Sequence, residues 1–343
     1  MKKKNLNNSS KVIIKYQYFF KKKTIIYGNI QNILPFFLKK KKFIIFIKKY
    51  DFLKYVPFFK KKYIIYFGIQ KIIFKFSNCI IFFWSKNKKE SLVEIKKLIK
   101  LLPIKCIIYI IGDKNSGIKS VKKELNSFIQ FQKFINIRHC IFIQGFIKNN
   151  KHTENIQIIK NNKNNFFFLP GVFSYNEIDQ GSLFLLSTFK KKIKGNILDL
   201  GCGIGILGIY LLKKYNRINI TFSDICLNSL IVTKKNILSK KINNKKYKII
   251  YSNIFSNINK KYDIIVCNPP IHNDLKINLY TFKKILYNFK YFIKKNGFLR
   301  IVVNNVISKN IIRKINKNFF IYKKNKKFCI YQFYLKNNTQ SGT

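Results

Sequence analysis

Alanine is absent from this chain of 343 residues, and acidic residues, arginine, glycine and proline are scarce. Only 12 residues are Asp or Glu, against 69 Lys and Arg, of which just four are arginine. Five residue types with A/T-rich codons (Phe, Ile, Lys, Asn and Tyr) fill 223 of the 343 positions, which indicates mutational pressure in a reduced, A/T-rich genome. The formal net charge of +57 is therefore only weak support for a nucleic-acid partner.

Long uncharged apolar runs and paired cysteines are also missing. No stretch of about 18 apolar residues lacks charged or strongly polar residues, and the basic start has no apolar segment of signal-peptide length behind it. The seven cysteines are widely spread, with no C-x-x-C pair. We therefore predict a cytoplasmic protein with free thiols, no membrane partner and no metal site. Because 47% of the residues are hydrophobic, global disorder is excluded.

Apolar runs of strand length recur along the chain, bounded by Lys and Asn clusters. Continuous Ile, Val and Phe runs, rather than alternation, indicate strands that are covered on both faces, and hence parallel sheets. Between the runs lie longer stretches with apolar residues at helical spacing. The sequence predicts an α/β fold, with strands at 79–84, 106–111, 196–200, 263–266 and 298–303 and helices at 91–102 and 280–294.

The two halves of the chain resemble each other, which indicates duplication of one α/β unit. The polar stretch 148–165 is the best candidate for a linker. We predict a domain over 1–160, a second domain over 166–336 and a disordered tail over 337–343. The similar segments, in the same order, are 77–89 with 261–273, 104–120 with 297–310, and 138–147 with 327–336.

A glycine-rich turn follows the expected strand 196–200 and precedes an expected helix over 204–214. Glycine permits left-handed turns and close approach of a ligand, and a helix N-terminus offers free N–H groups. Spacing from Gly203 onward matches G-x-G-x-x-G, so a dinucleotide site remains an alternative. The first half lacks such a turn. The candidate cofactor-binding residues of the turn are Gly201, Cys202, Gly203 and Gly205.

Polar residues lie at the ends of three expected strands around this turn: 196–200 and two further apolar runs, 220–224 and 248–251. A carboxylate at Asp199 would repel a pyrophosphate but suits the ammonium group of a methionyl moiety. Asp224 can accept two hydrogen bonds from a ribose diol, and Asn253 can contact an adenine 6-amino group. The pattern predicts S-adenosyl-L-methionine as the cofactor. Alternatively, both acids are caps or turn residues, as Asp beside glycine often is.

A second motif, Asn268-Pro269-Pro270, follows the expected strand 263–266. Proline cannot continue a central strand, so the loop leaves the sheet stiffly and holds its carbonyl groups in fixed directions. An Asn carbonyl beside a Pro carbonyl forms a cradle with two acceptors for a flat –NH2 group, and catalysis would be positioning plus electrostatics. Ile271 and His272 are weaker candidates for substrate contact. An ordinary Asn-Pro turn is the alternative.

These motifs together resemble class I methyltransferases that act on exocyclic or amide nitrogens. The segments Leu169-Pro-Gly-Val-Phe-Ser174, Asp179-Gln-Gly-Ser182 and Leu185-Leu-Ser-Thr188 are similar to the bacterial 16S rRNA guanine-2-amino methyltransferases, the ribosomal RNA small subunit methyltransferase C family. The resemblance covers about residues 77–335. It departs from the family at Ile271, where an aromatic residue is usual, and after His272, where Asn-Asp replaces Asp-Gly.

The resemblance implies two tandem class I methyltransferase (Rossmann-like) domains, of which the second binds S-adenosyl-L-methionine and the first is degenerate and aids folding and RNA binding. The implied reaction methylates the 2-amino group of one guanine in 16S rRNA, within the 30S subunit, by a monomer. Two other functions stay open: an amino or amide methyltransferase acting on protein glutamine or another nucleic acid, and a non-catalytic RNA-binding assembly factor.

Overall fold

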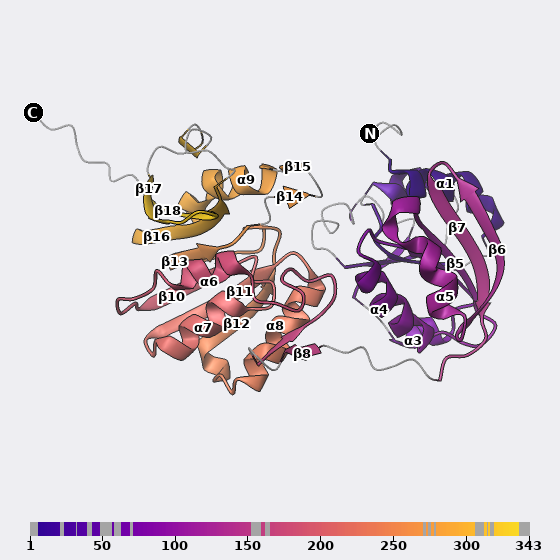
Figure 1. Cartoon of the computed structure of the whole chain (residues 1–343), viewed down its shortest axis with the longest axis horizontal. Coiled ribbons are helices and arrows are strands. Elements are labelled where there is room, and N and C mark those ends of the chain that lie inside the picture. The colour runs from indigo at the N-terminus through magenta and orange to yellow at the C-terminus, as the bar shows by residue number, and fades with distance from the viewer. Residues whose placement is uncertain are drawn as a thin grey trace, which may run out of the picture. The chain divides into compact units, whose positions relative to one another are not determined.

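The computed structural model describes residues 6–20, 24–31, 33–39, 43–48, 57, 63–68, 71–151, 159–161, 165–269, 272–273, 276–277, 279–305, 312–313, 315 and 319–335. Its contacts divide the chain into a first unit, Met1–Gln157, and a second unit, Ile158–Thr343. Each unit contains one seven-stranded sheet with helices packed against it (Figure 1).

The sheet of the second unit has the strand order β12-β11-β10-β13-β16-β18-β17. Its first five strands are parallel, and the hairpin of β17 and β18 adds two antiparallel strands at the edge beside β16. The sheet is thus mostly parallel, as the continuous apolar runs predict. Its strands are β10 (Gly195–Leu200), β11 (Ile218–Asp224), β12 (Tyr247–Tyr251), β13 (Tyr262–Cys267), β16 (Ile293–Asn304), β17 (Phe319–Lys324) and β18 (Phe328–Tyr334).

Helices cover both faces of this sheet. One face carries α6 (Gln180–Leu186), which packs on β16, α7 (Ile206–Lys214), which packs on β10 and β11, and α8 (Leu227–Ser239), which packs on β11 and β12. On the other face, α9 (Tyr280–Asn288) buries Phe282, Ile285 and Leu286 against strand residues such as Leu198 and Cys267. Two short antiparallel pairs complete the unit: β8 (Ile159–Asn161) with β9 (Phe166–Phe168), and β14 (His272–Asn273) with β15 (Lys276–Ile277).

The sheet of the first unit has the order β3-β2-β1-β4-β5-β7-β6, which is the same arrangement. Its strands are β1 (Ile25–Gly28), β2 (Ile44–Ile47), β3 (Ile64–Phe67), β4 (Cys79–Phe83), β5 (Ile107–Asp113), β6 (Ile129–Ile137) and β7 (Cys140–Ile147). Its helices are α1 (Asn8–Tyr16), α3 (Lys71–Lys75), α4 (Lys88–Ile99) and α5 (Val121–Leu125). The predicted α/β class with two tandem sheets is confirmed.

Each pair of segments that the sequence matched occupies the same place in its own sheet: β4 with β13, β5 with β16, and β7 with β18. The sequence aligns 77–89 with 261–273 only loosely, and an end-to-end pairing of the two segments is off by one position. That pairing places Phe83 opposite Cys267. In the structure, the side chain that packs on the sheet face covered by the next helix is Phe82 in β4 and Cys267 in β13. A slip of one residue moves a side chain to the opposite face, so packing identifies the correct register.

Two expected helices have different bounds. The helix expected over 91–102 begins earlier, at Lys88, because Asn87 accepts a hydrogen bond from the Glu90 N–H at 3.1 Å and caps the helix. The helix expected over 280–294 ends at Asn288, and β16 begins at Ile293, five residues before the expected strand. Parts of the expected linker (152–158 and 162–164) and the whole expected tail 337–343 lie outside the described residues. Within the described part, no helix is long and apolar enough to cross a membrane.

Candidate active site

The candidate residues of the second unit meet at one edge of its sheet. Asp199 is on β10, Asp224 ends β11, and Asn268 directly follows β13. The strand order reverses between β10 and β13, because the chain runs outward from β10 to β11 and later returns to the other side of β10. In open α/β sheets a ligand crevice forms at the carboxyl ends of the strands, at this reversal.

The glycines between β10 and α7 adopt left-handed conformations, with φ of +73° at Gly201, +55° at Gly203 and +83° at Gly205. The N–H groups of Gly201 and Cys202 both donate to the Ser223 carbonyl, at 2.8 and 2.9 Å. A Cβ atom at Gly201 or Gly203 would meet no atom within 4 Å, so the crevice above these two residues is open. A ligand can therefore lie directly against the backbone there.

The later glycines serve packing instead. A Cβ at Gly205 would lie 2.9 Å from Thr233 Cγ2, and one at Gly208 would lie 2.3 Å from the Phe222 ring. Glycine at these positions lets α7 approach the sheet and α8 closely. The G-x-G-x-x-G match thus contains one glycine that faces the crevice and two that face the protein.

The Asp199 side chain is fully buried at the base of the turn. Its Oδ2 accepts a hydrogen bond from the Gly208 N–H at 2.9 Å, whereas its Oδ1 has no partner among the described residues. Burial raises the pKa of Asp199 to about 7; the Gly208 hydrogen bond opposes this shift, and the nearby Asp224 charge adds to it. An unpaired buried carboxylate oxygen is costly, and a cationic donor would satisfy it. The donor set therefore fits the ammonium group of a methionyl moiety.

Asp224 is held at the end of β11 by the turn itself. Its Oδ2 accepts from the Gly203 N–H at 3.0 Å and its Oδ1 from the Cys226 N–H at 2.8 Å. Burial raises the pKa of Asp224, and these two hydrogen bonds act in the opposite direction. Hydrogen bonds from the Ser229 side chain and the Ile225 N–H also lower its pKa, so the carboxylate is held in place as an acceptor of the kind that a ribose diol requires.

Two further cofactor candidates lie beside the crevice. The Cys202 side chain is buried with its Sγ 3.5 Å from Thr233 Oγ1, so this residue presents only its backbone to the turn. Asn253 follows β12, and its N–H donates to Ser256 Oγ at 3.0 Å. The next residue, Ile254, has φ of +58°, a conformation rare for a β-branched side chain. The loop that carries Asn253 is therefore strongly constrained.

Asn268 is anchored through its amide nitrogen. Nδ2 donates to Asp179 Oδ2 at 2.6 Å and to Ser182 Oγ at 2.9 Å. A carboxylate only accepts hydrogen bonds, so the –NH2 end of the amide must face Asp179. Both amide hydrogens are then used, and Oδ1 is the group that remains to accept a hydrogen bond from a substrate.

Asp179 and Ser182 are functional candidates that sequence reasoning missed. Asp179 also caps α6 by accepting from the Ser182 N–H at 2.7 Å. The cap itself is visible in the sequence as an Asp before an apolar helix, but the contact with Asn268 spans 89 residues and has no local signal. Of the remaining candidates, Pro269 is buried, and the backbone of His272 in β14 pairs with that of Ile277 in β15. Pro270, Ile271 and the His272 side chain lie outside the described residues, so their roles stay predictions.

All seven cysteines are free thiols. Among the residues that the structure describes, no group of three or more His, Cys, Asp and Glu side chains could hold a metal ion.

The chain matches two family models. The methyltransferase small domain matches residues 163–332, and the N-terminal domain of the same methyltransferases matches residues 10–161. Ribosomal RNA small subunit methyltransferase C of Buchnera aphidicola subsp. Schizaphis graminum is 37% identical over 343 residues, covering 96% of this chain and 99% of that protein. The protein of the same name from Photorhabdus laumondii is 34% identical over 66% of this chain and 67% of that protein.

A solved structure shares the fold of the whole chain. The T. thermophilus 16S rRNA N2 G1207 methyltransferase (RsmC), in complex with AdoMet and guanosine, superposes with a TM-score of 0.82 over 97% of this chain and 93% of that one, at 14% sequence identity. The dinucleotide alternative has no support among these relatives, whose shared chemistry is methyl transfer. The chain belongs to the ribosomal RNA small subunit methyltransferase C family, whose members are S-adenosyl-L-methionine-dependent methyltransferases.

Proposed function

We propose that this protein transfers a methyl group from S-adenosyl-L-methionine to the exocyclic 2-amino group of one guanine in 16S rRNA of the small ribosomal subunit. The observation that carries the proposal is the anchored amide of Asn268, which leaves one acceptor at the edge of an open crevice. The names of the relatives indicate that the substrate is ribosomal RNA of the small subunit. The solved relative, which is bound to AdoMet and guanosine, supports guanine as the base.

The residues around the glycine turn would hold the cofactor. Asp199 Oδ1 would accept from its ammonium group, Asp224 from its ribose hydroxyls and Asn253 from its adenine, while Gly201 and Gly203 let it lie against the backbone. When bound, the cofactor would supply a methyl group attached to a positively charged sulfur. Transfer of that methyl group turns the sulfonium into a neutral thioether, which is a good leaving group.

Asn268 and Pro269 would prepare the nucleophile. The lone pair of a guanine 2-amino group is delocalised into the ring, so the free amine is a poor nucleophile. Hydrogen bonds from its two N–H groups to Asn268 Oδ1 and to a proline carbonyl draw the nitrogen toward tetrahedral geometry and localise the lone pair. That pair forms the new N–C bond as the S–C bond breaks, and one amino proton is released to solvent. The contribution of these residues is positioning and preorganised polarity.

The proposal extends to the organisation of the chain. Residues 166–336 form the catalytic domain, and residues 1–160 form a degenerate domain without a cofactor site that supports folding and RNA binding. The protein works as a monomer in the cytoplasm on the 30S subunit or its rRNA. Support for a degenerate first domain comes from the residues at its strand ends, where Ile26, Ile47 and Phe83 are buried in a hydrophobic cluster.

Mapping of modified nucleosides tests the proposal. Unmodified 30S subunits and free 16S rRNA are incubated with the protein and radiolabelled cofactor, and the RNA is analysed by primer extension and by mass spectrometry of its nucleosides. We expect a single 2-methylguanosine. Label in ribosomal protein instead of RNA would support the protein-glutamine alternative, and cofactor binding without methyl transfer to either would support the assembly factor.

A further inference from the structure

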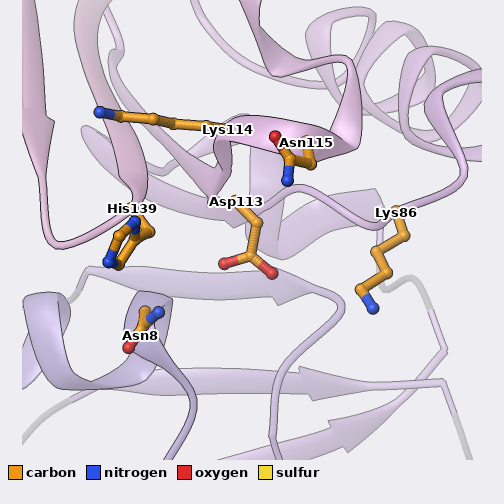
Figure 2. Close-up of a pocket in the computed structure, with 6 residues that line it drawn as sticks. All are labelled: Asn8, Lys86, Asp113, Lys114, Asn115 and His139. Carbon is orange, nitrogen blue, oxygen red and sulfur yellow. The ribbon is translucent and has the colours of Figure 1, made fainter.

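The first unit contains an open polar pocket of about 350 Å³ that the proposed reaction does not use. It lies at the end of β5, between the N-terminus of α1, the loop after β4 and the turn that joins β6 to β7 (Figure 2). Its lining side chains are a carboxylate, two amides, an imidazole and two amines, from Asp113, Asn8, Asn115, His139, Lys86 and Lys114.

The Asp113 carboxylate is directed into the pocket. Asp113 occupies the N-cap position of the 3-10 turn Lys114–Ser116, but its side chain makes no capping hydrogen bond. Among the residues that the structure describes, its Oδ1 accepts only a weak hydrogen bond from the Cys140 thiol, at 3.4 Å. Figure 2 shows the Asp113 carboxylate pointing into the space between His139 and Lys86, with Asn8 below His139 in this view. Its oxygens can therefore accept hydrogen bonds from a ligand.

His139 forms the rim of the pocket through a constrained turn. Arg138 and His139 join β6 to β7 with φ of +46° and +62°, a left-handed pair of the kind that usually requires Asn or Gly. The His139 carbonyl accepts from the Lys114 N–H at 2.9 Å, which ties the turn to the end of β5. Backbone strain of this kind is often retained at functional positions. The exposed imidazole offers an aromatic face beside the carboxylate.

Composition makes the carboxylate and the imidazole informative. Lysine is so abundant in this chain that two lysines in a pocket carry little weight, whereas the sequence has only 12 acids and three histidines. A site for phosphate alone would not place a carboxylate at its centre. The ligand must therefore present N–H donors to Asp113, a flat ring to His139 and, at its edge, negative charge to Lys86 and Lys114.

We propose that this pocket binds a second guanine nucleotide of the RNA substrate, one that is unpaired and is not methylated. Guanine carries two adjacent donors, N1–H and the 2-amino group, which a carboxylate can accept together, and no other RNA base presents that pair. Recognition of single-stranded RNA commonly combines stacking on an aromatic ring with hydrogen bonds to the base edge, and lysines position the phosphates. The inference rests on the proposed function, because it requires an RNA substrate.

The pocket lies on the same face of its sheet as the Asn268 cluster does in the second unit. Asp113 shares the face of Phe83, which packs with α1, and Asn268 lies on the face that carries α6. Asn268 itself corresponds to Phe83, so the pocket lies at the end of the neighbouring strand, β5, on the same face.

Charge removal gives a sharp test. Asp113→Asn makes the chain more basic, so general electrostatics alone would strengthen RNA binding, whereas our proposal predicts weaker binding by about tenfold, the scale of one bidentate base contact. The probe is 16S rRNA, measured by filter binding at fixed salt. Glu124→Gln is the matched control, since it removes a carboxylate in the same unit that pairs with Lys88 outside the pocket. It should keep or raise the affinity.

Inosine substitution identifies the contacted base. Inosine lacks the 2-amino group, so replacing the bound guanine should weaken binding to the wild type but not to Asp113→Asn. We test short RNAs in which each guanine near the methylation site is replaced in turn. Coupling at one guanine supports the proposal; unchanged affinity of Asp113→Asn, or no coupling at any guanine, overturns it. The proposed function fails separately, if the wild type does not methylate 16S rRNA. Unchanged cofactor affinity and thermal unfolding show that the variant is folded.

Discussion

The two sheets of this chain share one strand order, yet the strands that should frame a cofactor end in residues of different character. In each unit the helix after the fourth strand, α4 or α9, packs on one face, where the strand residues include Ile25 and Phe82 in the first unit and Leu198 and Cys267 in the second. This shared face and the strand registers align the two units residue by residue.

On that alignment, three polar residues of the second unit correspond to apolar residues of the first. Asp199 corresponds to Ile26, Asp224 to Ile47 and Asn268 to Phe83. All three apolar residues are buried in one hydrophobic cluster with α1. The positions that hold charge and amide at a crevice in one unit therefore contribute to the core of the other. Comparison of the two shows that the fold does not depend on the site.

The crevice itself is closed in the first unit. Gly28 corresponds to Gly201, and both are left-handed, with φ of +107° and +73°. A Cβ at Gly28 would lie 2.3 Å from the Phe83 carbonyl oxygen, whereas one at Gly201 would meet nothing within 4 Å. The Asn29 N–H donates to that same carbonyl at 2.8 Å, so the chain after β1 covers the end of β4. A ligand has no access to the backbone there.

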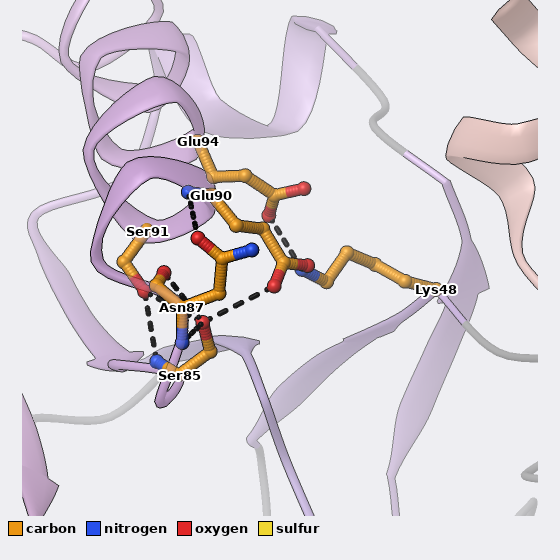
Figure 3. A network of polar contacts seen from close by, with 6 residues as sticks. All are labelled: Lys48, Ser85, Asn87, Glu90, Ser91 and Glu94. Carbon is orange, nitrogen blue, oxygen red and sulfur yellow. Dashed lines mark hydrogen bonds and ion pairs between the residues drawn. The ribbon is translucent and has the colours of Figure 1, made fainter. Parts of the chain in front are cut away.

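A polar network replaces the Asn-Pro-Pro loop (Figure 3). After β4 the chain enters α4 directly, and Ser85 Oγ donates to Glu90 Oε2 at 3.1 Å. Lys48, at the end of β2, forms an ion pair with the buried Glu94 at 2.7 Å and lies 3.6 Å from Glu90 Oε1. The loop that would face a substrate is therefore short, and the helix that follows it is tied to the end of β2.

Within the described part of the chain, a buried serine hydroxyl of the first unit has no partner at the place where the second unit has the Asn268 amide. The Ser10 Oγ of α1 is buried without a hydrogen-bond partner among the described residues. Ser10 is the third residue of α1, as Ser182 is of α6, and Ser182 Oγ accepts from Asn268. Where the second unit has Asn268, the first has Phe83, which cannot donate. The orphaned hydroxyl is consistent with descent from a site like that of the second unit.

The largest effect is expected from Asn268→Ala. It removes the acceptor that reshapes the target nitrogen, so the single-turnover rate of guanine methylation should fall by about two to three orders of magnitude. Cofactor affinity, measured by isothermal titration, should change little. Asn268→Asp would set a carboxylate against Asp179 and lose the donor that anchors the side chain, so it should restore little of the lost activity. Methylation by Asn268→Ala at the wild-type rate would make the Asn-Pro-Pro motif a structural turn.

The next largest effect is expected from Asp224→Ala. Loss of charged hydrogen bonds to the ribose should weaken cofactor binding by about 2 to 3 kcal/mol. Ile47→Val changes the corresponding residue of the first unit and should leave the affinity unchanged. Equal affinities for Asp224→Ala and the wild type would show that the ligand or its orientation is wrongly assigned.

Asp179→Ser separates anchoring from capping. Serine can still cap α6, but it is too short to reach the Asn268 amide in the same way, so the methylation rate should fall about tenfold with the helix intact. Asn7→Ser makes the same kind of change at the cap of α1, in the first unit, and should leave the rate unchanged. If both variants kept the wild-type rate, the Asp179–Asn268 bond would have no role in positioning.

Asp199 makes cofactor binding depend on pH. Burial raises its pKa from 3.8 to about 7 in the free protein, so below pH 7 the carboxyl group is largely protonated and must lose its proton to pair with an ammonium group. Affinity should therefore rise up to about tenfold per pH unit as the pH approaches 7, and level off above it. A cofactor affinity that does not depend on pH, or the same pH dependence in Asp199→Asn, would contradict this role.

The raised pKa of Asp199 also affects stability. The free folded state binds this proton more tightly than the unfolded chain does, so the Asp199 contribution lowers the unfolding free energy as the pH rises from about 4 to 7.

The sequence predicts the site of the second unit in detail, and in the first unit it predicts the elements β4, α4 and β5. The glycine turn and the acids at strand ends are local patterns, so the sequence alone predicts that Asp199, Gly201 and Asp224 lie at the sheet edge. The partner of Asn268 could not be predicted in this way, because Asp179 lies 89 residues away and only packing brings them together. The sequence also indicates the duplication of one unit. Ile-rich strands of the two halves, however, align equally well in adjacent registers, and only the contacts with the helices show which face of the sheet each side chain occupies.

Cofactor stoichiometry tests the comparison most directly. Isothermal titration of the full chain with S-adenosyl-L-methionine should give one binding site per chain, and Asp224→Ala should weaken that site without revealing another. A second tight site in the wild type, or one that survives in Asp224→Ala and is lost on substitution of Ile47 or Phe83, would contradict the account, because the first unit would then bind cofactor despite its filled crevice.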